Sequence, residues 1–145
     1  MEFKYERIVV AVDGSEASEK AFKKSLEIAK RNNNARLILA HVVDSRAFAT
    51  IEVYDRTLTE RAEEYAKELL DEYVELAKQS GVDDLVRVVE YGSPKVKIPK
   101  NIAKDFDADL IVCGATGMNA MERFLIGSVS ESIARYATCD VLVVR

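Results

Sequence analysis

Short runs of β-branched and other apolar residues alternate with longer amphipathic stretches along the chain. Alternation of this kind is typical of βαβ units, in which each helix returns the chain so that the next strand lies parallel to the last. The apolar runs predict strands at 7–13, 36–43, 85–90, 110–113 and 141–144. Apolar residues at helical spacing predict helices at 17–29, 62–77, 95–107 and 128–138.

The strand-forming runs are apolar almost throughout, as strands are when helices cover both faces of a sheet. We therefore predict an α/β fold with a doubly wound, five-stranded parallel sheet in the order 3-2-1-4-5 and helices on both faces. The 145 residues are expected to form one domain, 1–145, without an internal linker. The connection 44–58 has no clear period, and because loops of that length in compact domains are usually functional, it is a candidate cover for a site.

The composition argues against two classes of partner. The formal net charge is −4 and no broad basic face follows from the sequence, so we do not expect nucleic acid as a partner. The apolar run 8–12 is far shorter than a signal-peptide core or a spanning helix, so we expect a cytoplasmic protein with no membrane partner. Cys113 and Cys139 lie beside apolar runs, and both are expected to be reduced thiols.

Two glycines follow the fourth predicted strand, and a Gly-Ser pair follows them, in the stretch GATGMNAMERFLIGSVSE, residues 114–131. Ligands of doubly wound sheets lie at the carboxyl ends of the strands. Gly114 and Gly117 would leave backbone N–H groups uncovered there, and the Gly-Ser pair would add N–H groups at a helix N-terminus, which together could hold phosphate. The alternative is an ordinary helix start, because Ser128 and Glu131 have the spacing of a capping box. Spacing alone leaves both interpretations open.

Catalytic candidates are sparse. His41 is the only histidine and lies in an apolar run, so we expect a buried, hydrogen-bonded imidazole. The sequence has no zinc-ligand spacing, no G-x-S-x-G elbow, no G-x-x-x-x-G-K-[ST] loop, and no G-x-G-x-x-G after its first strand. Asp13 and Asp44 are the carboxylates expected at the site, and either could meet a metal that accompanies phosphates. No catalytic residue is assigned.

The spacing Gly114-x2-Gly117-x9-Gly127-Ser128 occurs together with VAVDGSEASEKA, AHVVD and CDVLVVR. These motifs resemble the universal stress protein family essentially from end to end, and within it the branch that binds ATP. The resemblance implies that Asp13 binds the ribose and that the backbone of Val42 holds the adenine. It also implies which residues lie beneath the nucleotide, namely Ala11 and Val12, and which surround its ribose and phosphates, namely Gly114, Gly117, Gly127, Ser128, Val129 and Ser130. The implied cofactor is ATP, accompanied by a divalent metal such as Mg²⁺.

The chain departs from the family pattern at three places. Met118 stands where many relatives carry a basic residue, which weakens neutralisation of a triphosphate. The region around Pro99 is one residue longer than the usual loop, so the third helix is expected to begin near Pro99 with this proline in its first turn. No family consensus covers the connection 44–58, so contacts there are not assigned.

The last predicted strand is expected at an edge of the sheet, where unpaired N–H and C=O groups favour association. Two copies of the chain are therefore expected to associate through this edge strand, Val141 to Val144, as a homodimer. The resemblance also implies a homodimer. The leading hypothesis is a cytoplasmic, homodimeric ATP-binding protein that regulates an unidentified protein partner in the stress response. The alternatives are a slow ATPase or adenylyl-transferring enzyme on the same fold, and a dimerisation module that binds no nucleotide.

Overall fold

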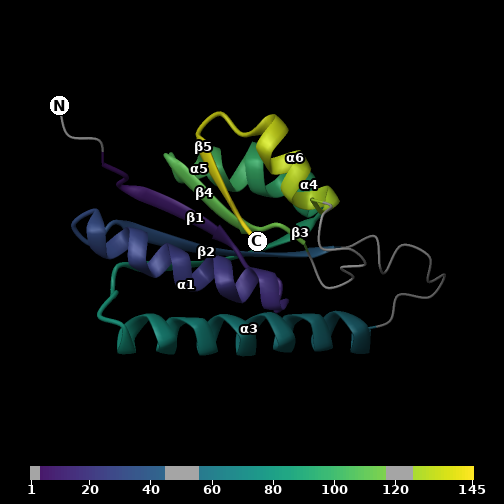
Figure 1. Cartoon of the computed structure of the whole chain (residues 1–145). Helices are drawn as coiled ribbons and strands as arrows, with labels where there is room; N and C mark the ends of the chain where they lie inside the picture. Colours follow the sequence, from purple (N-terminus) through teal and green to yellow (C-terminus); the bar gives the residue numbers. More distant parts are fainter. Residues whose placement is uncertain (1–3, 45–55, 117–125) are drawn as a thin grey trace.

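A five-stranded parallel sheet runs through the middle of the molecule (Figure 1). The computed structural model describes residues 4–44, 56–116 and 126–145. The strands lie in the order β3-β2-β1-β4-β5 and every neighbouring pair is parallel, which confirms the predicted topology. The strands are β1 (Arg7–Ala11), β2 (Arg36–Asp44), β3 (Leu85–Gly92), β4 (Leu110–Gly114) and β5 (Asp140–Val144).

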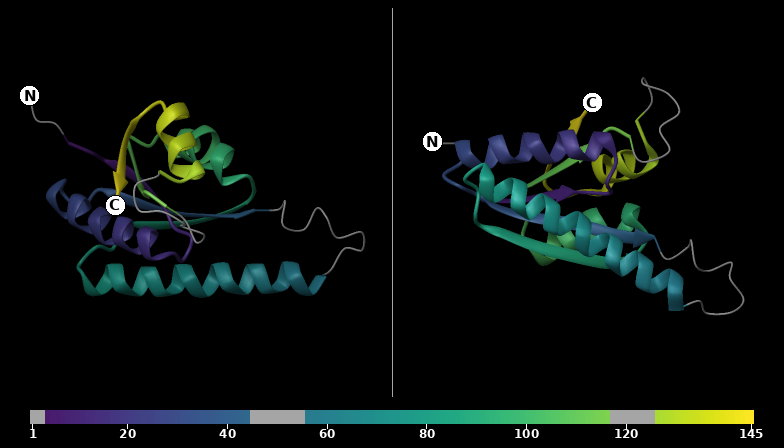
Figure 2. Two further views of the ribbon diagram at one scale, coloured as in Figure 1. Left: turned by 45° about the vertical axis from the view of Figure 1, so that its right-hand side comes forward. Right: turned by 90° about the horizontal axis from the view of Figure 1, so that it is seen from below.

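Helices cover both faces of this sheet, and the two faces have separate cores (Figures 1 and 2). One face carries α1 (Glu16–Arg31) and α3 (Arg56–Gln79). The other face carries α4 (Pro94–Val96), η1 (Lys97–Ile102), α5 (Ala103–Asp105) and α6 (Ser128–Tyr136). Because successive strand residues point to opposite faces, Val10 belongs to the first core and Val9 to the second. The winding therefore reverses between β1 and β4, where ligands of such sheets bind.

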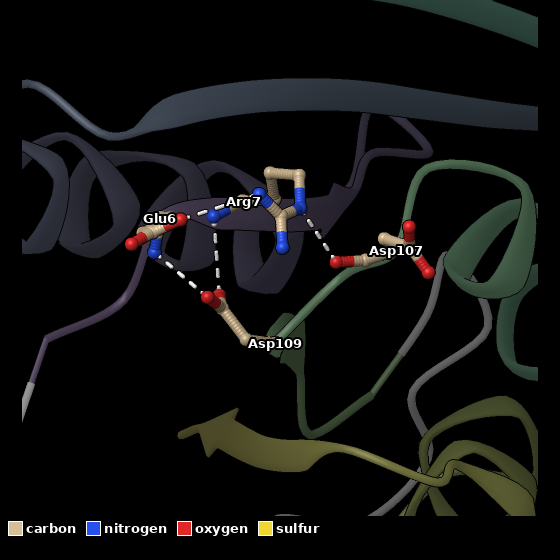
Figure 3. Close-up of polar contacts among 4 residues, drawn as sticks. All are labelled: Glu6, Arg7, Asp107 and Asp109. Carbon is tan, nitrogen blue, oxygen red and sulfur yellow. Dashed lines mark hydrogen bonds and ion pairs between the residues drawn. The ribbon is translucent and has the colours of Figure 1, made fainter.

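One carboxylate joins the amino ends of β1 and β4 (Figure 3). Asp109 accepts a hydrogen bond from the N–H of Glu6 at 2.8 Å and from the N–H of Arg7 at 3.1 Å. Arg7 Nε donates to the carbonyl of Asp107 at 2.8 Å. These contacts fix the register of the two central strands at the end of the sheet opposite the predicted site, so the site lies on a rigid base.

The first strand ends earlier than predicted. The sequence predicts a strand over 7–13, whereas β1 ends at Ala11. The N–H of Asp13 donates to Ser18 Oγ at 3.2 Å, and Gly14 has a φ of 84°, so the chain turns out of the sheet there. Ser15 then caps α1 by accepting from the N–H of Ser18 at 3.1 Å. All five strands agree with the predicted boundaries to within two residues at each end, and β1 is the strand that ends before its predicted boundary.

The third predicted helix begins at the other proline of its segment. It starts at Pro94, the first helical position, and runs without a break through η1 to Asp105, so the expected start near Pro99 is wrong. Pro99 is buried inside the π-helical segment. Since it has no N–H to donate to the carbonyl of Lys95, four residues back, that carbonyl accepts from Ser132 Oγ on α6 at 3.0 Å. The proline thus leaves the carbonyl of Lys95 available, and the hydrogen bond from Ser132 to this carbonyl joins the helix to α6.

Both cysteines are free thiols, as predicted. Burial raises the pKa of the Cys113 thiol to about 11. Burial, together with Asp109 and Asp140, also raises the pKa of Cys139. Neither thiol is therefore a reactive thiolate near neutral pH. Within 4–44, 56–116 and 126–145, no helix is both long and apolar enough to cross a membrane.

Candidate functional site

The main chain of Val42 in β2 is open toward the position that β1 has left. Ala11 pairs with Ala40, so Val42 lies two residues further along, level with Asp13. The N–H of Val12 donates to the carbonyl of Ala40 at 2.9 Å, and this is the last hydrogen bond of the ladder between the two strands. Because main-chain groups alternate in direction along a strand, the N–H and C=O of Val42 also face β1. Neither group bonds to a described residue on that side.

A histidine explains why the ladder stops at this point. The next bond would join the N–H of Val42 to the carbonyl of Val12, but His41 Nδ1 lies 2.8 Å from that carbonyl. Since a carbonyl only accepts, Nδ1 carries the hydrogen. His41 is 7% exposed, so the prediction of a buried, hydrogen-bonded imidazole is confirmed. Its contact with Val12 occupies the acceptor that the N–H of Val42 would use, and among the described residues neither main-chain group of Val42 has a partner on the β1 side.

Asp13 lies at the start of the turn that follows β1. Its Oδ1 accepts from the N–H of Ser15 at 2.8 Å, which leaves Oδ2 without a partner among the described residues. The side chain is partly exposed at the carboxyl end of the sheet. A carboxylate there accepts hydrogen bonds from hydroxyl groups and repels phosphate. The family resemblance implies that Ala11 and Val12 lie beneath the nucleotide. Ala11 is the partly buried last residue of β1, and Val12 is the buried residue that follows it, just before this turn.

The N-terminus of α6 opens beside the end of β4. Gly127 is its N-cap residue and contributes no side-chain bond, while the Glu131 carboxylate pairs with Arg135 at 2.9 Å. The expected capping box between Ser128 and Glu131 is therefore wrong. No described side chain caps the first N–H groups of α6, and these groups carry the positive end of the helix dipole.

The carbonyl of Ala115 holds this helix start in place. It accepts from the N–H of Gly127 at 2.6 Å, and Ser130 Oγ lies 3.0 Å from it. Ser130 Oγ is also 2.9 Å from the carbonyl of Gly127. Ser130 is 3% exposed, and its hydroxyl is used in these two contacts with main-chain carbonyls. Its N–H is one of the first N–H groups of α6, which no described side chain caps. Ser128 is exposed, and Val129 packs partly against the second core.

Gly114 has a packing role that its sequence position does not reveal. A Cβ on Gly114 would lie 2.7 Å from the main-chain carbon of Ala17 in α1. Its φ is not in the positive range. The close approach of β4 to α1 is therefore sufficient reason for this glycine, without a left-handed conformation. Gly117 and Met118 lie outside the described residues, as does most of the connection 44–58.

One residue at the site was missed by sequence reasoning. Tyr65 is assigned by its spacing to the buried face of its helix, yet it is 45% exposed and its hydroxyl donates to the carbonyl of Asp13 at 3.1 Å. Burial raises the pKa of Tyr65, and Asp13 raises it further. Helical spacing places Tyr65 on the sheet side but gives no information about which strand end it reaches.

The arrangement offers binding groups and few catalytic ones. It brings together a main-chain donor and acceptor on Val42, a carboxylate on Asp13 and the open N-terminus of α6. Within the described parts of the chain, no group of three or more His, Cys, Asp or Glu residues could hold a metal ion.

Known proteins share both the sequence and the fold. The profile of the universal stress protein family matches residues 4–145. A relative from Staphylococcus saprophyticus whose name assigns it to the universal stress proteins is 50% identical over 141 residues, covering 97% of this chain and 84% of the relative.

Two solved structures extend this comparison. The universal stress protein UspA from Lactobacillus plantarum has a TM-score of 0.81 at 29% identity, over 99% of this chain and 100% of that one. A universal stress protein in complex with cAMP has a TM-score of 0.69 at 29% identity, over 99% and 98% of the two chains. The fold and the sequence relationship thus cover the whole described chain.

Proposed function

Because the chain belongs to the universal stress protein family, we propose that it binds ATP where β1, β2 and β4 end and that the nucleotide regulates its contact with another protein. A related protein of the same fold is in complex with cAMP, which supports an adenine nucleotide as the ligand class. The regulatory role follows from a site that has binding groups without an evident base or nucleophile.

The observation that carries the proposal is the main chain of Val42, which has no partner among the described residues on its β1 side. Its N–H and C=O face the same side, beyond the last bond of the β1–β2 ladder. The adenine edge offers a matching acceptor at N1 and donor at the N6 amino group. An unpaired main-chain pair at a switch point is costly unless water or a ligand bonds to it. We therefore place the adenine against Val42.

The charges of the site set the orientation of the rest of the nucleotide. Asp13 repels phosphate and accepts from hydroxyl groups, so the ribose lies beside it. The open N–H groups of Ser128, Val129 and Ser130 attract anions, so the phosphates lie at α6. Hydrogen bonds to charged groups contribute about 1.5 to 3 kcal/mol each, so a few of them are sufficient for micromolar affinity. Mg²⁺ would bind the phosphates and accompany ATP.

We also propose a homodimer through β5. This strand forms one edge of the sheet, and no described residue pairs with its outer side. Val141, Leu142, Val143 and Val144 are all only partly buried. An apolar edge of this kind is a template for strand pairing with a second copy. The cytoplasmic location and the identity of the regulated protein remain predictions from the sequence.

A dimerisation module without a nucleotide is the competing function. It is favoured by Gly114 and Ser130, because packing against α1 and bonding to Ala115 explain these two residues without a ligand. The two functions differ in what they predict for Val42, since only the nucleotide hypothesis gives its main chain a partner.

The test compares ATP with inosine triphosphate by calorimetry on nucleotide-free protein. Inosine differs from adenosine only at the edge that would face Val42, where it carries an acceptor at O6 and a donor at N1. We expect ATP to bind with micromolar affinity and inosine triphosphate to bind at least about tenfold more weakly, since each mismatched buried group costs about 1 to 3 kcal/mol. Absence of ATP binding would support the dimerisation module, and equal binding of both would remove Val42 from the site.

A further inference from the structure

Two successive carbonyls beyond β1 are held by aromatic side chains from other elements. His41 of β2 donates to Val12 at 2.8 Å, and Tyr65 of α3 donates to Asp13 at 3.1 Å. The two rings contact each other edge to face, with 5.9 Å between centroids and 61° between planes. The peptide groups on both sides of Asp13 are thus fixed by one pair of rings.

The remaining polar groups of Asp13 are also engaged, apart from one oxygen. Its N–H donates to Ser18 Oγ at 3.2 Å, and its Oδ1 accepts from the N–H of Ser15 at 2.8 Å. Tyr65 completes this set by holding the carbonyl. These contacts fix the orientation of the carboxylate, and among the described residues Oδ2 has no partner, so it can meet a ligand.

The position of the Tyr65 hydroxyl shows that the turn and α3 fit closely together. A Cβ on Gly14 would lie 2.0 Å from this hydroxyl, and Gly14 has a φ of 84°. The turn can therefore approach Tyr65 only with glycine at this position. Since Tyr65 is 45% exposed, its burial contributes modestly to the core, and its defining contact is the one to Asp13.

We propose that Tyr65 is a positioning residue that lets Asp13 distinguish a ribose from a sugar without hydroxyl groups. This inference rests on the proposed function. A carboxylate recognises a hydroxyl group best when its free oxygen is already in place, because no ordering cost is then incurred on binding. Without the Tyr65 hydroxyl, the peptide after Asp13 loses its anchor and the carboxylate samples more orientations. The part of the affinity that depends on the ribose hydroxyls then falls, while contacts to adenine and phosphates persist.

The experiment measures dissociation constants for ATP and for 2′,3′-dideoxy-ATP, which lacks both hydroxyls. Tyr65→Phe removes only the hydroxyl of a half-exposed side chain. We expect it to weaken ATP binding about three- to tenfold, the value of one neutral hydrogen bond, and to change binding of the dideoxy nucleotide by less than about twofold. Tyr91→Phe is the matched control, because its hydroxyl bonds to Glu63 at 3.3 Å, and both dissociation constants should stay unchanged.

A second measurement uses Asp13→Ala as the background. There Tyr65→Phe should have no further effect on ATP binding, because the group it positions is gone. An equal loss for both nucleotides in Tyr65→Phe would mean a general structural role and would overturn the inference. So would unchanged ATP binding, or a wild-type protein that binds both nucleotides equally. A wild-type protein that binds no ATP would overturn the proposed function and this inference together.

Discussion

His41 decides where the hydrogen-bond ladder between β1 and β2 stops. Its Nδ1 donates to the carbonyl that would otherwise accept from Val42. One buried imidazole therefore occupies the acceptor that the N–H of Val42 would otherwise use, and the turn after β1 takes the chain away before it can bond to the carbonyl of Val42. This role needs no contact with the ligand, so a buried histidine in the core can perform it.

Ser128 gives a residue-level prediction about the helix N-terminus. Proline is tolerated at the first helical position, and Gly127 already has the extended conformation, φ −65° and ψ 160°, that a following proline requires. Ser128→Pro should therefore remove one N–H without unfolding α6. We expect ATP to bind about tenfold or more weakly to this variant than to Ser128→Ala, because a hydrogen bond to a charged group contributes about 1.5 to 3 kcal/mol. Calorimetry on both variants measures the difference.

The comparison with Ser128→Ala separates the N–H group from the hydroxyl group. Both variants lose the hydroxyl, and only the proline loses the N–H. Equal affinities for ATP would show that the main chain at this position does not contact phosphate. Circular dichroism spectra that match the wild type would confirm that α6 is intact in both.

At this scale the sequence predicts positions better than roles. Asp13, Val42 and the start of α6, which the family resemblance implies as site residues, lie near the carboxyl ends of neighbouring strands. Gly114 and Ser130 were expected near phosphate, and the structure adds packing contacts that the sequence did not indicate, to Ala17 for Gly114 and to the carbonyls of Ala115 and Gly127 for the Ser130 hydroxyl. A side-chain role depends on which other element comes close, and spacing within one segment does not contain that information.

Pro99 and Ser132 show how two helices on one face of the sheet are coupled. The proline withholds an N–H from the carbonyl of Lys95, and Ser132 of α6 supplies the missing donor. Since α6 opens its N-terminus toward the site, this bond helps to hold the helix that would bind phosphate. A helix over 95–107 was predicted from helical spacing. The spacing could not show where this helix starts, nor that it contains a π-helical turn and is bonded to Ser132 of α6.

The coupling can be measured through protein stability. Ser132→Ala should lower the free energy of unfolding by about 0.5 to 1.5 kcal/mol, because it leaves the carbonyl of Lys95 without its side-chain donor. In the background of Pro99→Ala, which restores an N–H near that carbonyl, the loss should be clearly smaller. Urea denaturation of the wild type, the two single variants and the double variant gives the coupling energy. Strict additivity would contradict the proposed exchange of donors.

The architecture of the whole molecule could be predicted from the alternation of strands and helices. The order β3-β2-β1-β4-β5 follows from right-handed crossovers and a single reversal of the winding. The site lies at that reversal for the same reason. The hydrophobic pattern of the sequence could not predict the length of β1. The contacts that end this strand come from Ser18 and His41, which belong to other elements.

The proposed dimer concerns the whole molecule, and the direction of the β5 main chain gives a test of it. The carbonyl of Val144 accepts from the N–H of Ala115 at 2.7 Å, so this carbonyl faces β4. By alternation, Leu142 also faces β4 and Val143 faces outward. Val143→Pro should therefore preserve the fold and abolish strand pairing between two copies, because proline is tolerated on an edge when its missing N–H points outward.

Light scattering after size-exclusion chromatography measures this change. We expect a dimer for the wild type and for Val143→Thr, which keeps the N–H, and a folded monomer for Val143→Pro. Leu142→Pro should instead destabilise the monomer, since it removes a bond to β4. A dimer that persists in Val143→Pro would place the interface elsewhere.

The central claim is that an adenine nucleotide binds across the carboxyl ends of β1, β2 and the start of α6. The most direct measurement is an NMR titration of ¹⁵N-labelled protein with MgATP, in which each backbone amide reports its own contact. The account predicts the largest shift changes at the amides of Val42, of Asp13 to Ser15 and of Ser128 to Ser130. Small changes there, or changes concentrated at the amino ends of the strands around Asp109, would contradict it.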